Sequence, residues 1–187
     1  MISPLLYLGI DIAYRRDTAA VAIVYLDAET SRYCLWDHRI WQPPVHIPDV
    51  TEAVLRVLRG YRVAGVLFDP FQYVGESQRL AKEGYGRILV EVNQSSEMVE
   101  VGNNLHTHMQ RSDFYLYNND EILSQFSWCA ARATERGYRI VKSQQSKPVD
   151  IVVAIAMALW GATRDVAGIA QPAYDDEAHA VALEDMP

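Results

Sequence analysis

The chain has 187 residues, of which half are hydrophobic and 22% are charged, which is typical of one globular domain and excludes an extensively disordered chain. The sequence has no run of 18 apolar residues and no signal-peptide pattern, so neither a membrane-spanning helix nor secretion is predicted. The formal net charge of −7 argues, at face value, against a nucleic-acid partner, because nucleic acid is itself a polyanion.

The first part of the chain predicts three strands and a helix. The strands are expected over Leu5–Ile12, Ala19–Leu26 and Tyr33–Trp41. Because the connections between them are short, the three strands should form an antiparallel meander. Asp49 and Glu52 have the spacing of a helix capping box, and Gly60 is expected to end that helix.

Helices and strands then alternate along the rest of the chain. Further strands or extended segments are expected over 63–68, 87–92, 114–117 and 138–142. Further helices are expected over 73–83, from a Ser95 cap to Met109, over 120–136 and over 148–163. This order predicts a mixed α/β sheet, antiparallel at one edge and parallel elsewhere, with helices on both faces. Residues 1–164 are the expected domain, and residues 165–187 are expected to form a mobile acidic tail.

Four aspartates stand inside apolar segments or at the ends of predicted elements. Asp11 lies within the first apolar run, and Asp69 ends the 63–68 run. Asp150 lies in the first turn of the last helix, and Asp17 opens the second strand. A buried carboxylate is costly unless it is paired or binds a metal, and sites in α/β sheets form at the carboxyl ends of strands. Oxygen ligands select Mg²⁺ or Mn²⁺, and two such ions can activate water for phosphodiester cleavage.

Each aspartate also has a purely structural interpretation. Asp11 satisfies backbone donors at a strand end, and Asp69 before Pro70 starts a turn. Asp150 stabilises a helix N-terminus through the helix dipole, and Asp17 is explained equally well as a turn residue. The metal-site hypothesis therefore depends on whether the aspartates converge in the folded chain.

Several basic residues lie near the aspartates in the sequence and are candidates for binding a DNA backbone. Arg15 and Arg16 lie in the loop between Asp11 and Asp17. Lys142 and Lys147 precede Asp150. The alternative is that all four are simply solvated.

Three segments together resemble the nuclease domain of the large terminase subunit of tailed bacteriophages. They are Leu8-Gly-Ile-Asp-Ile-Ala-Tyr-Arg-Arg-Asp-Thr-Ala-Ala20, Val66-Leu-Phe-Asp-Pro-Phe-Gln72 and Lys147-Pro-Val-Asp-Ile-Val-Val-Ala-Ile-Ala-Met-Ala158. Their order and spacing carry the resemblance, which spans roughly residues 5–163.

The resemblance implies an RNase H-like fold and a metal-dependent endonuclease that cuts concatemeric viral DNA during packaging. It implies that Asp11, Asp69 and Asp150 are catalytic and bind two Mg²⁺ or Mn²⁺ ions, with Asp17 as an auxiliary ligand. The family often has two adjacent acids at the third position, where Val149 precedes Asp150 in this chain. The fourth ligand is therefore open, and Asp17 or water are the alternatives.

The resemblance also implies partners and a location. The partners are double-stranded DNA, a terminase ATPase domain, the small terminase subunit and the portal, in the cytoplasm of an infected bacterial host. The sequence has no Walker motif, so the chain is expected to be an excised domain or a separately encoded subunit.

Three other functions remain as alternatives. A Holliday-junction resolvase of the same fold uses a similar acidic cluster. The segment Gly9-Ile-Asp11 is similar to the phosphate-loop strand of actin and sugar-kinase ATP-binding halves. In this chain, however, Ala13, Tyr14 and Arg15 replace the Gly and Ser or Thr that such a loop needs. A non-catalytic docking module of the packaging machinery is the third alternative.

The distribution of charge removes the initial objection to a DNA partner. Residues 165–187 carry six acidic residues and no Lys or Arg, which leaves residues 1–164 with a net charge of −1. When the four aspartates of the proposed site are set aside, the rest of that domain has a charge of +3. The acidity is concentrated in the predicted tail and the predicted metal site, and the remainder is mildly basic.

Overall fold

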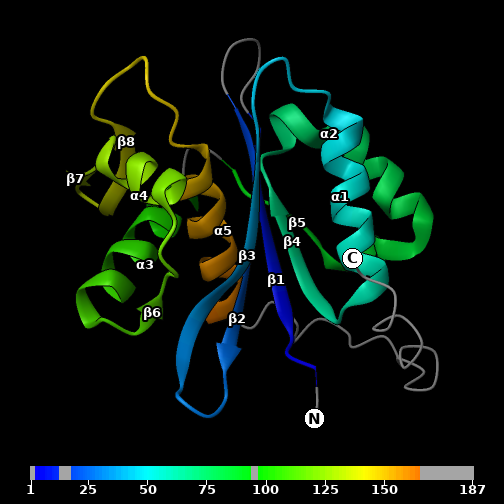
Figure 1. Cartoon of the computed structure of the whole chain (residues 1–187), viewed down its shortest axis with the longest axis horizontal. Helices are drawn as coiled ribbons and strands as arrows, with labels where there is room; N and C mark the ends of the chain where they lie inside the picture. The colour runs from blue at the N-terminus through cyan, green and yellow to red at the C-terminus, as the bar shows by residue number, and fades with distance from the viewer. Residues whose placement is uncertain (1–2, 13–17, 94–96, 165–187) are drawn as a thin grey trace.

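A six-stranded mixed sheet forms the centre of the molecule, as seen in Figure 1. The computed structural model describes residues 3–12, 18–93 and 97–164, so the expectations for Asp17, Arg15, Arg16, Ser95 and the acidic tail lie outside the described residues. The strand order is β5-β4-β1-β2-β3-β6. The strands are β1 (Leu6–Ile12), β2 (Ala19–Asp27), β3 (Arg32–Trp41), β4 (Val63–Phe68), β5 (Leu89–Glu91) and β6 (Phe114–Tyr115).

The antiparallel meander β1–β2–β3 is confirmed, but its predicted place at one edge of the sheet is wrong. β4 and β5 extend the sheet in parallel beyond β1, and the short strand β6 pairs in parallel with β3 on the other side. The backbone N–H of Tyr33 also donates to the Asp113 carbonyl oxygen, 3.0 Å away, which joins β6 to the sheet. The meander therefore occupies the middle of the sheet, where β1 pairs with β2 on one side and with β4 on the other.

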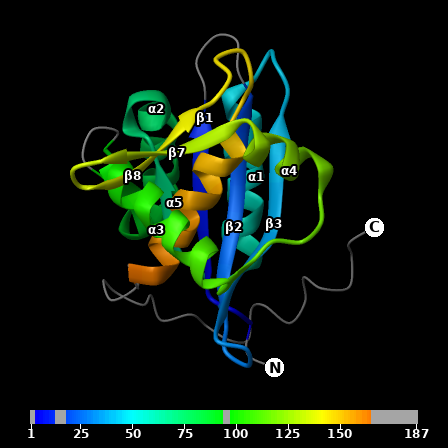
Figure 2. The ribbon, with the colours of Figure 1, turned by 90° about the vertical axis from the view of Figure 1, so that its left-hand side faces the viewer.

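Helices cover both faces of the sheet, as predicted. α1 (Ile47–Gly60) and α2 (Pro70–Leu80) pack on one face, against the cluster that contains Leu8, Ile10 and Phe68. The helices on the opposite face are α3 (Glu97–Arg111), α4 (Asp120–Ser127) and α5 (Asp150–Arg164), as Figures 1 and 2 show. No helix in the described part of the chain is long and apolar enough to cross a membrane.

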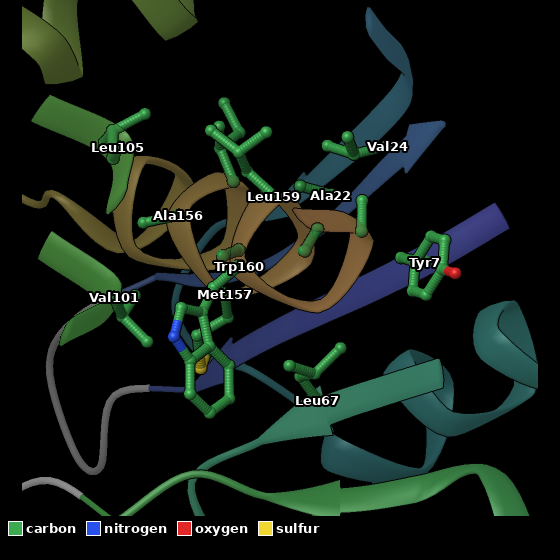
Figure 3. Packing of buried hydrophobic residues seen from close by; sticks show 14 of the residues in the cluster. Tyr7, Ala22, Val24, Leu67, Val101, Leu105, Ala156, Met157, Leu159 and Trp160 are labelled. Atoms are coloured by element: carbon green, nitrogen blue, oxygen red, sulfur yellow. The ribbon is translucent and has the colours of Figure 1, made fainter. Parts of the chain in front are cut away.

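Helix α5 lies directly on the central strands, and nearly all of its residues from Asp150 to Ala162 are buried. Gly9 in β1 makes this approach possible, because a Cβ atom there would lie 2.0 Å from the Ala154 carbonyl oxygen. Figure 3 shows the resulting layer, in which Met157, Leu159 and Trp160 of α5 lie among side chains from the sheet and α3. The absence of a side chain at Gly9 therefore allows the short distance between the backbones of α5 and β1.

The predicted helix over 120–136 is wrong in its second half. α4 ends at Ser127, and the chain then forms a hairpin of β7 (Cys129–Thr134) and β8 (Gly137–Lys142). Gly137 has a φ of +128°, which allows the tight turn, and Thr134 Oγ1 donates to the Gly137 carbonyl oxygen at 2.8 Å. Packing on α3 overrides the helix propensity of the alanines here: at Gly102 a Cβ would lie only 2.5 Å from the Tyr138 carbonyl oxygen. Figure 2 shows the hairpin beside α3.

Other element boundaries differ from the predicted ones by a few residues, and capping explains the start of α2. α1 begins at Ile47, so Asp49 is inside its first turn and the predicted capping box does not form. α2 begins at Pro70, three residues earlier than predicted, because the Asp69 carboxylate caps it. α5 begins at Asp150, two residues later than predicted. The strand predicted over 87–92 is reduced to Leu89–Glu91, after an irregular helical segment over 81–88.

The close approach at Gly9 predicts a large effect for a single methyl group. Gly9→Ala should lower the free energy of unfolding by about 2 kcal/mol or more, because the neighbouring atoms belong to the α5 backbone and cannot rotate away. Gly75→Ala in α2 is the matched control, because nothing lies within 4 Å of a Cβ there and the helix should gain about 0.5–1 kcal/mol. Urea denaturation followed by circular dichroism measures both. Equal stability of the Gly9→Ala variant and the unmodified chain would contradict this role for Gly9.

Candidate metal centre

The strand register places Asp11 and Asp69 at the same edge of the sheet. Ile10 of β1 pairs with Phe68 of β4 in a parallel ladder, so the residues that follow them, Asp11 and Asp69, stand at adjacent positions. This edge is formed by the carboxyl ends of both strands, where ligands bind in open α/β sheets. On the other side of β1, Asp11 pairs with Ala20 of β2.

Asp69 also has a structural role at this position. Its Oδ1 atom accepts a hydrogen bond of 3.0 Å from the Phe71 backbone N–H, and so it caps α2. Pro70 follows as the first helical residue, where its missing N–H costs nothing. The side chain is buried, with 7% of its surface exposed. Asp69 therefore has a structural role, although as the N-cap of α2 and not as the predicted turn residue, and this role leaves its second carboxylate oxygen for the cluster.

Asp150 is the first residue of α5, and neighbours from two other elements hold it in place. The Thr18 hydroxyl, at the entrance to β2, donates a short hydrogen bond to Asp150 Oδ2. Gln125 of α4 is buried and accepts a hydrogen bond of 3.1 Å from the Ile151 N–H, which satisfies an otherwise unpaired donor at the start of α5. Asp150 is 3% exposed, so its carboxylate belongs to the interior of the site.

The three aspartates interact electrostatically. Burial raises the pKa of Asp11 well above its ordinary value, and the Asp150 and Asp69 carboxylates raise it further. A hydrogen bond to Asp150 acts in the same direction, and the Lys142 ammonium group acts against it. Asp11, Asp69 and Asp150 therefore form one cluster, drawn from β1, the end of β4 and the start of α5.

The donor set of this cluster fits a hard divalent cation, although the carboxylates are not yet arranged around one point. In the part of the chain that the structure describes, no group of three or more His, Cys, Asp or Glu side chains stands ready to hold a metal ion. Metal ligands must be deprotonated, so a bound divalent cation would compete with protons for the carboxylates of Asp11, Asp69 and Asp150. Three carboxylates with a nearby hydroxyl are the oxygen ligands that Mg²⁺ and Mn²⁺ prefer.

The two lysines predicted to bind DNA have different surroundings, and only Lys142 is shown to lie near the acids. Lys142, at the end of β8, is close enough to Asp11 to affect its pKa, so it belongs to the electrostatic environment of the acids. The Lys147 Nζ atom lies 4.8 Å from the centre of the Trp128 ring. This cation–π contact holds the Lys147 side chain against Trp128. In the sequence, Lys147 precedes Asp150 by three residues.

Sequence reasoning missed two positioning residues, Thr18 and Gln125. Thr18 stands just before the second strand, and the antiparallel pairing of Ile12 with Ala19 brings it beside the end of β1. The strand pairing expected for the predicted meander places Thr18 beside the end of the first strand, so the sequence carried a signal for this residue. Gln125 has no such signal, because its hydrogen bond to Ile151 depends on how α4 packs against α5.

Solved nuclease structures of phage large terminases have a similar fold. The HK97 bacteriophage large terminase matches with a TM-score of 0.73 and 14% identity, over 86% of this chain and 40% of that chain. The large terminase nuclease from thermophilic phage G20c with bound magnesium gives 0.63 and 19%, over 83% of this chain and 80% of that chain. The g2p nuclease domain from bacteriophage SPP1 with bound Mn gives 0.55 and 15%, over 86% of each chain.

These similarities establish that the chain has the RNase H-like mixed α/β fold of a large terminase nuclease domain. The resemblance seen in the three sequence segments is thereby confirmed for the fold. No protein-family model matches the sequence, and no curated protein is significantly similar to it. The chain spans 40% of the length of the HK97 large terminase.

The clustering of carboxylates predicts that Asp11→Asn stabilises the metal-free protein. Because the pKa of Asp11 is raised, the folded state binds this proton more tightly than the unfolded state, so stability falls as the pH rises through the raised pKa. At pH 8 in EDTA, Asp11→Asn should therefore raise the melting temperature by roughly 2–8 °C, for a gain of about 1–2 kcal/mol. Mn²⁺ should raise the melting temperature of the unmodified chain but not that of the variant.

The control for this experiment is Asp120→Asn, at the exposed first residue of α4. It should lower stability slightly, through the helix dipole, and keep the response to Mn²⁺. A melting temperature of Asp11→Asn below that of the unmodified chain in EDTA would show that Asp11 is a structural residue and not part of a strained ligand set.

The hydrogen bond from Thr18 predicts a positioning role that can be separated from packing. Thr18→Val keeps the side-chain shape but removes the donor to Asp150, and should weaken Mn²⁺ binding by about 10–100-fold. Thr18→Ser keeps the hydroxyl and should bind Mn²⁺ nearly as the unmodified chain does. Isothermal titration calorimetry measures the affinities. Equal affinity in the valine and serine variants would rule out this role for the hydroxyl.

Proposed function

We propose that this chain is a divalent-metal-dependent DNA endonuclease that cuts concatemeric viral DNA during genome packaging, as the nuclease domain of a large terminase. The observation that carries the proposal is the convergence of Asp11, Asp69 and Asp150 at the carboxyl edge of the sheet. The similarity of the fold to solved terminase nucleases, including ones with bound magnesium and Mn, supports it.

The ligand roles follow from the positions of the three acids. Asp11, Asp69 and Asp150 would hold Mg²⁺ or Mn²⁺, and the number of ions we propose is two. Asp17 is proposed as the auxiliary ligand, next to Thr18, whose hydroxyl holds Asp150. When bound, the ions supply an activated water and positive charge that stabilises the phosphorane-like transition state and the leaving oxygen.

The remaining residues orient the site and the substrate. Thr18 and Gln125 fix the start of α5, and therefore the direction of the Asp150 carboxylate. Lys142 reduces the repulsion among the acids when they are fully ionised and attracts the scissile phosphate. Lys147 against Trp128 is proposed as a backbone contact, as are Arg15 and Arg16. Contacts of this kind position the duplex without reading its sequence.

The wider role rests on the resemblance to the terminase family. Residues 1–164 would be the nuclease domain, and residues 165–187 a separate acidic tail. We infer that the partners are double-stranded DNA, a terminase ATPase domain, the small terminase subunit and the portal, and that the protein acts in the cytoplasm of an infected bacterial cell.

The experiment is plasmid cleavage in Mn²⁺ with two carboxylate variants. Asp69→Asn and Asp150→Asn should each reduce the cleavage rate by about 10³-fold or more, because loss of a ligand removes several kcal/mol of transition-state stabilisation. Asp120→Asn is the matched control, since it makes the same change at the first residue of another helix, away from the cluster. It should cleave at the rate of the unmodified chain.

Circular dichroism spectra identical to that of the unmodified chain would show that the two inactive variants are folded. Full activity in either one would overturn the proposed mechanism. Preferential cleavage of four-way junctions over linear duplex would favour a Holliday-junction resolvase. Absence of both cleavage and any thermal shift with Mn²⁺ would favour a non-catalytic docking module.

A further inference from the structure

A second polar site lies at the opposite end of α5 from the aspartates. It is a hollow of about 370 Å³ between α3, the end of α5 and the turn of the β7–β8 hairpin. The residues that matter most for its chemistry are Glu100, Asn104, Thr107, Arg111, Arg136 and Arg164. The three arginines come from three different elements, so the fold brings them together.

The charges in this hollow are unbalanced. Arg164 forms an ion pair with Glu100, and its guanidinium carbon lies 4.3 Å from the centre of the Trp160 ring. Among the described residues, neither Arg111 nor Arg136 forms an ion pair with a carboxylate. The hollow therefore carries three guanidinium groups against one carboxylate, and two of the three are uncompensated.

The position of Arg136 is fixed by the turn that carries it. Gly137, with its positive φ, rests so closely on α3 that a Cβ there would lie 3.0 Å from the Asn103 side chain. The Arg136 N–H also donates to Thr134 Oγ1 at 3.3 Å, which closes the turn. Arg136 is thereby held beside the middle of α3, next to Asn103.

Guanidinium groups that line one polar hollow repel each other and together attract an anion. The planar fork of arginine matches a phosphate group with two parallel hydrogen bonds, and hydroxyl and amide groups such as those of Thr107 and Asn104 add further contacts. The chemistry of the hollow therefore points to a phosphate group as its ligand.

Distance and continuity connect this hollow to the proposed nuclease site. The 14 residue steps from Asp150 to Arg164 correspond to about 21 Å along α5, or roughly six base pairs of a duplex. The hairpin spans the interval, because Lys142 lies by the acids and Arg136 by the hollow. Between them, exposed Arg132 pairs directly opposite Arg139 across the hairpin. A stretch of DNA backbone that ran along the hairpin would pass the exposed side chains of Arg132 and Arg136.

We propose that the hollow formed by Arg111, Arg136 and Arg164 binds a backbone phosphate of the DNA duplex, about 20 Å from the catalytic aspartates. This inference rests on the proposed nuclease function. It adds a second contact, which would hold the duplex in place while a DNA strand is cut at the aspartates.

The test measures DNA binding without cleavage. Fluorescence anisotropy of a labelled 30-base-pair duplex in EDTA gives the affinity at several salt concentrations. Each phosphate contact contributes about −0.9 to the slope of log affinity against log salt. Because the hollow is proposed to hold one phosphate, the double variant Arg111→Gln/Arg136→Gln should therefore reduce the magnitude of the slope by about one. Because no cleavage is required, the outcome is independent of whether the aspartates act as proposed.

A matched double variant controls for the change in net charge. Arg56→Gln/Arg87→Gln removes two exposed charges outside the hollow, with Arg56 on α1 at the opposite face of the sheet, and should leave the slope unchanged. An equal decrease in both double variants would mean that only overall charge matters, and would overturn the proposal.

Inorganic phosphate distinguishes the two sources of the ligand. If phosphate stabilises the unmodified chain but not Arg111→Gln/Arg136→Gln, while the DNA slope is the same in both, the hollow binds a free anion and the DNA contact is wrong. If the slope falls as expected and phosphate weakens DNA binding only in the unmodified chain, the contact is a backbone phosphate.

Discussion

The contact between α5 and the backbone of β1 is the constraint on which the rest of this structure depends. A helix that is apolar on nearly all sides must be buried, and here it is buried against the two strands at the middle of the sheet. Gly9 removes the side chain that would hold the two backbones apart. Since Asp11 is two residues beyond Gly9 and Asp150 begins α5, the same contact that completes the core brings two of the three acids together. Packing and the candidate site therefore have a common cause.

The acids oppose the stability that this packing provides. Burial and mutual repulsion raise the pKa of Asp11, so ionising the cluster in the absence of a cation costs free energy. The surrounding residues limit that cost in different ways: the Asp69 carboxylate is partly used as a helix cap, and Thr18 donates to Asp150. Lys142 provides the opposite charge. Such local conflict between charge and burial is expected where a protein retains residues for chemistry and not for folding.

Much of this arrangement was predictable from sequence, because the signals were local. Continuous apolar runs correctly indicated β1, β2 and β4, and the apolar sequence of α5 correctly indicated a helix buried nearly all round. The expected proximity of Asp11 and Asp69 followed from one assumption, that β1 and β4 are parallel neighbours, and the register confirms that assumption. The place of Asp150 depends instead on how α5 packs on the sheet. The strand over 138–142 was predicted and corresponds to β8, but β7 was missed because its alanines favour a helix, whereas here the hairpin packs against Gly102 of α3. Gln125 and the arginine hollow depend on contacts between elements far apart in sequence, for which no local pattern exists.

The three clustered acids are separated by nearly the whole folded chain, from the first strand to the last helix. Until Asp150 has emerged from the ribosome during synthesis, only Asp11 and Asp69 of the cluster are available to the folding chain. Because contacts between distant residues form late in folding, the cluster can be completed only after the C-terminal helix has docked on the N-terminal strand. For the proposed nuclease, cleavage would therefore begin only after α5 has docked on β1, so a partly synthesised or partly folded chain would leave DNA uncut.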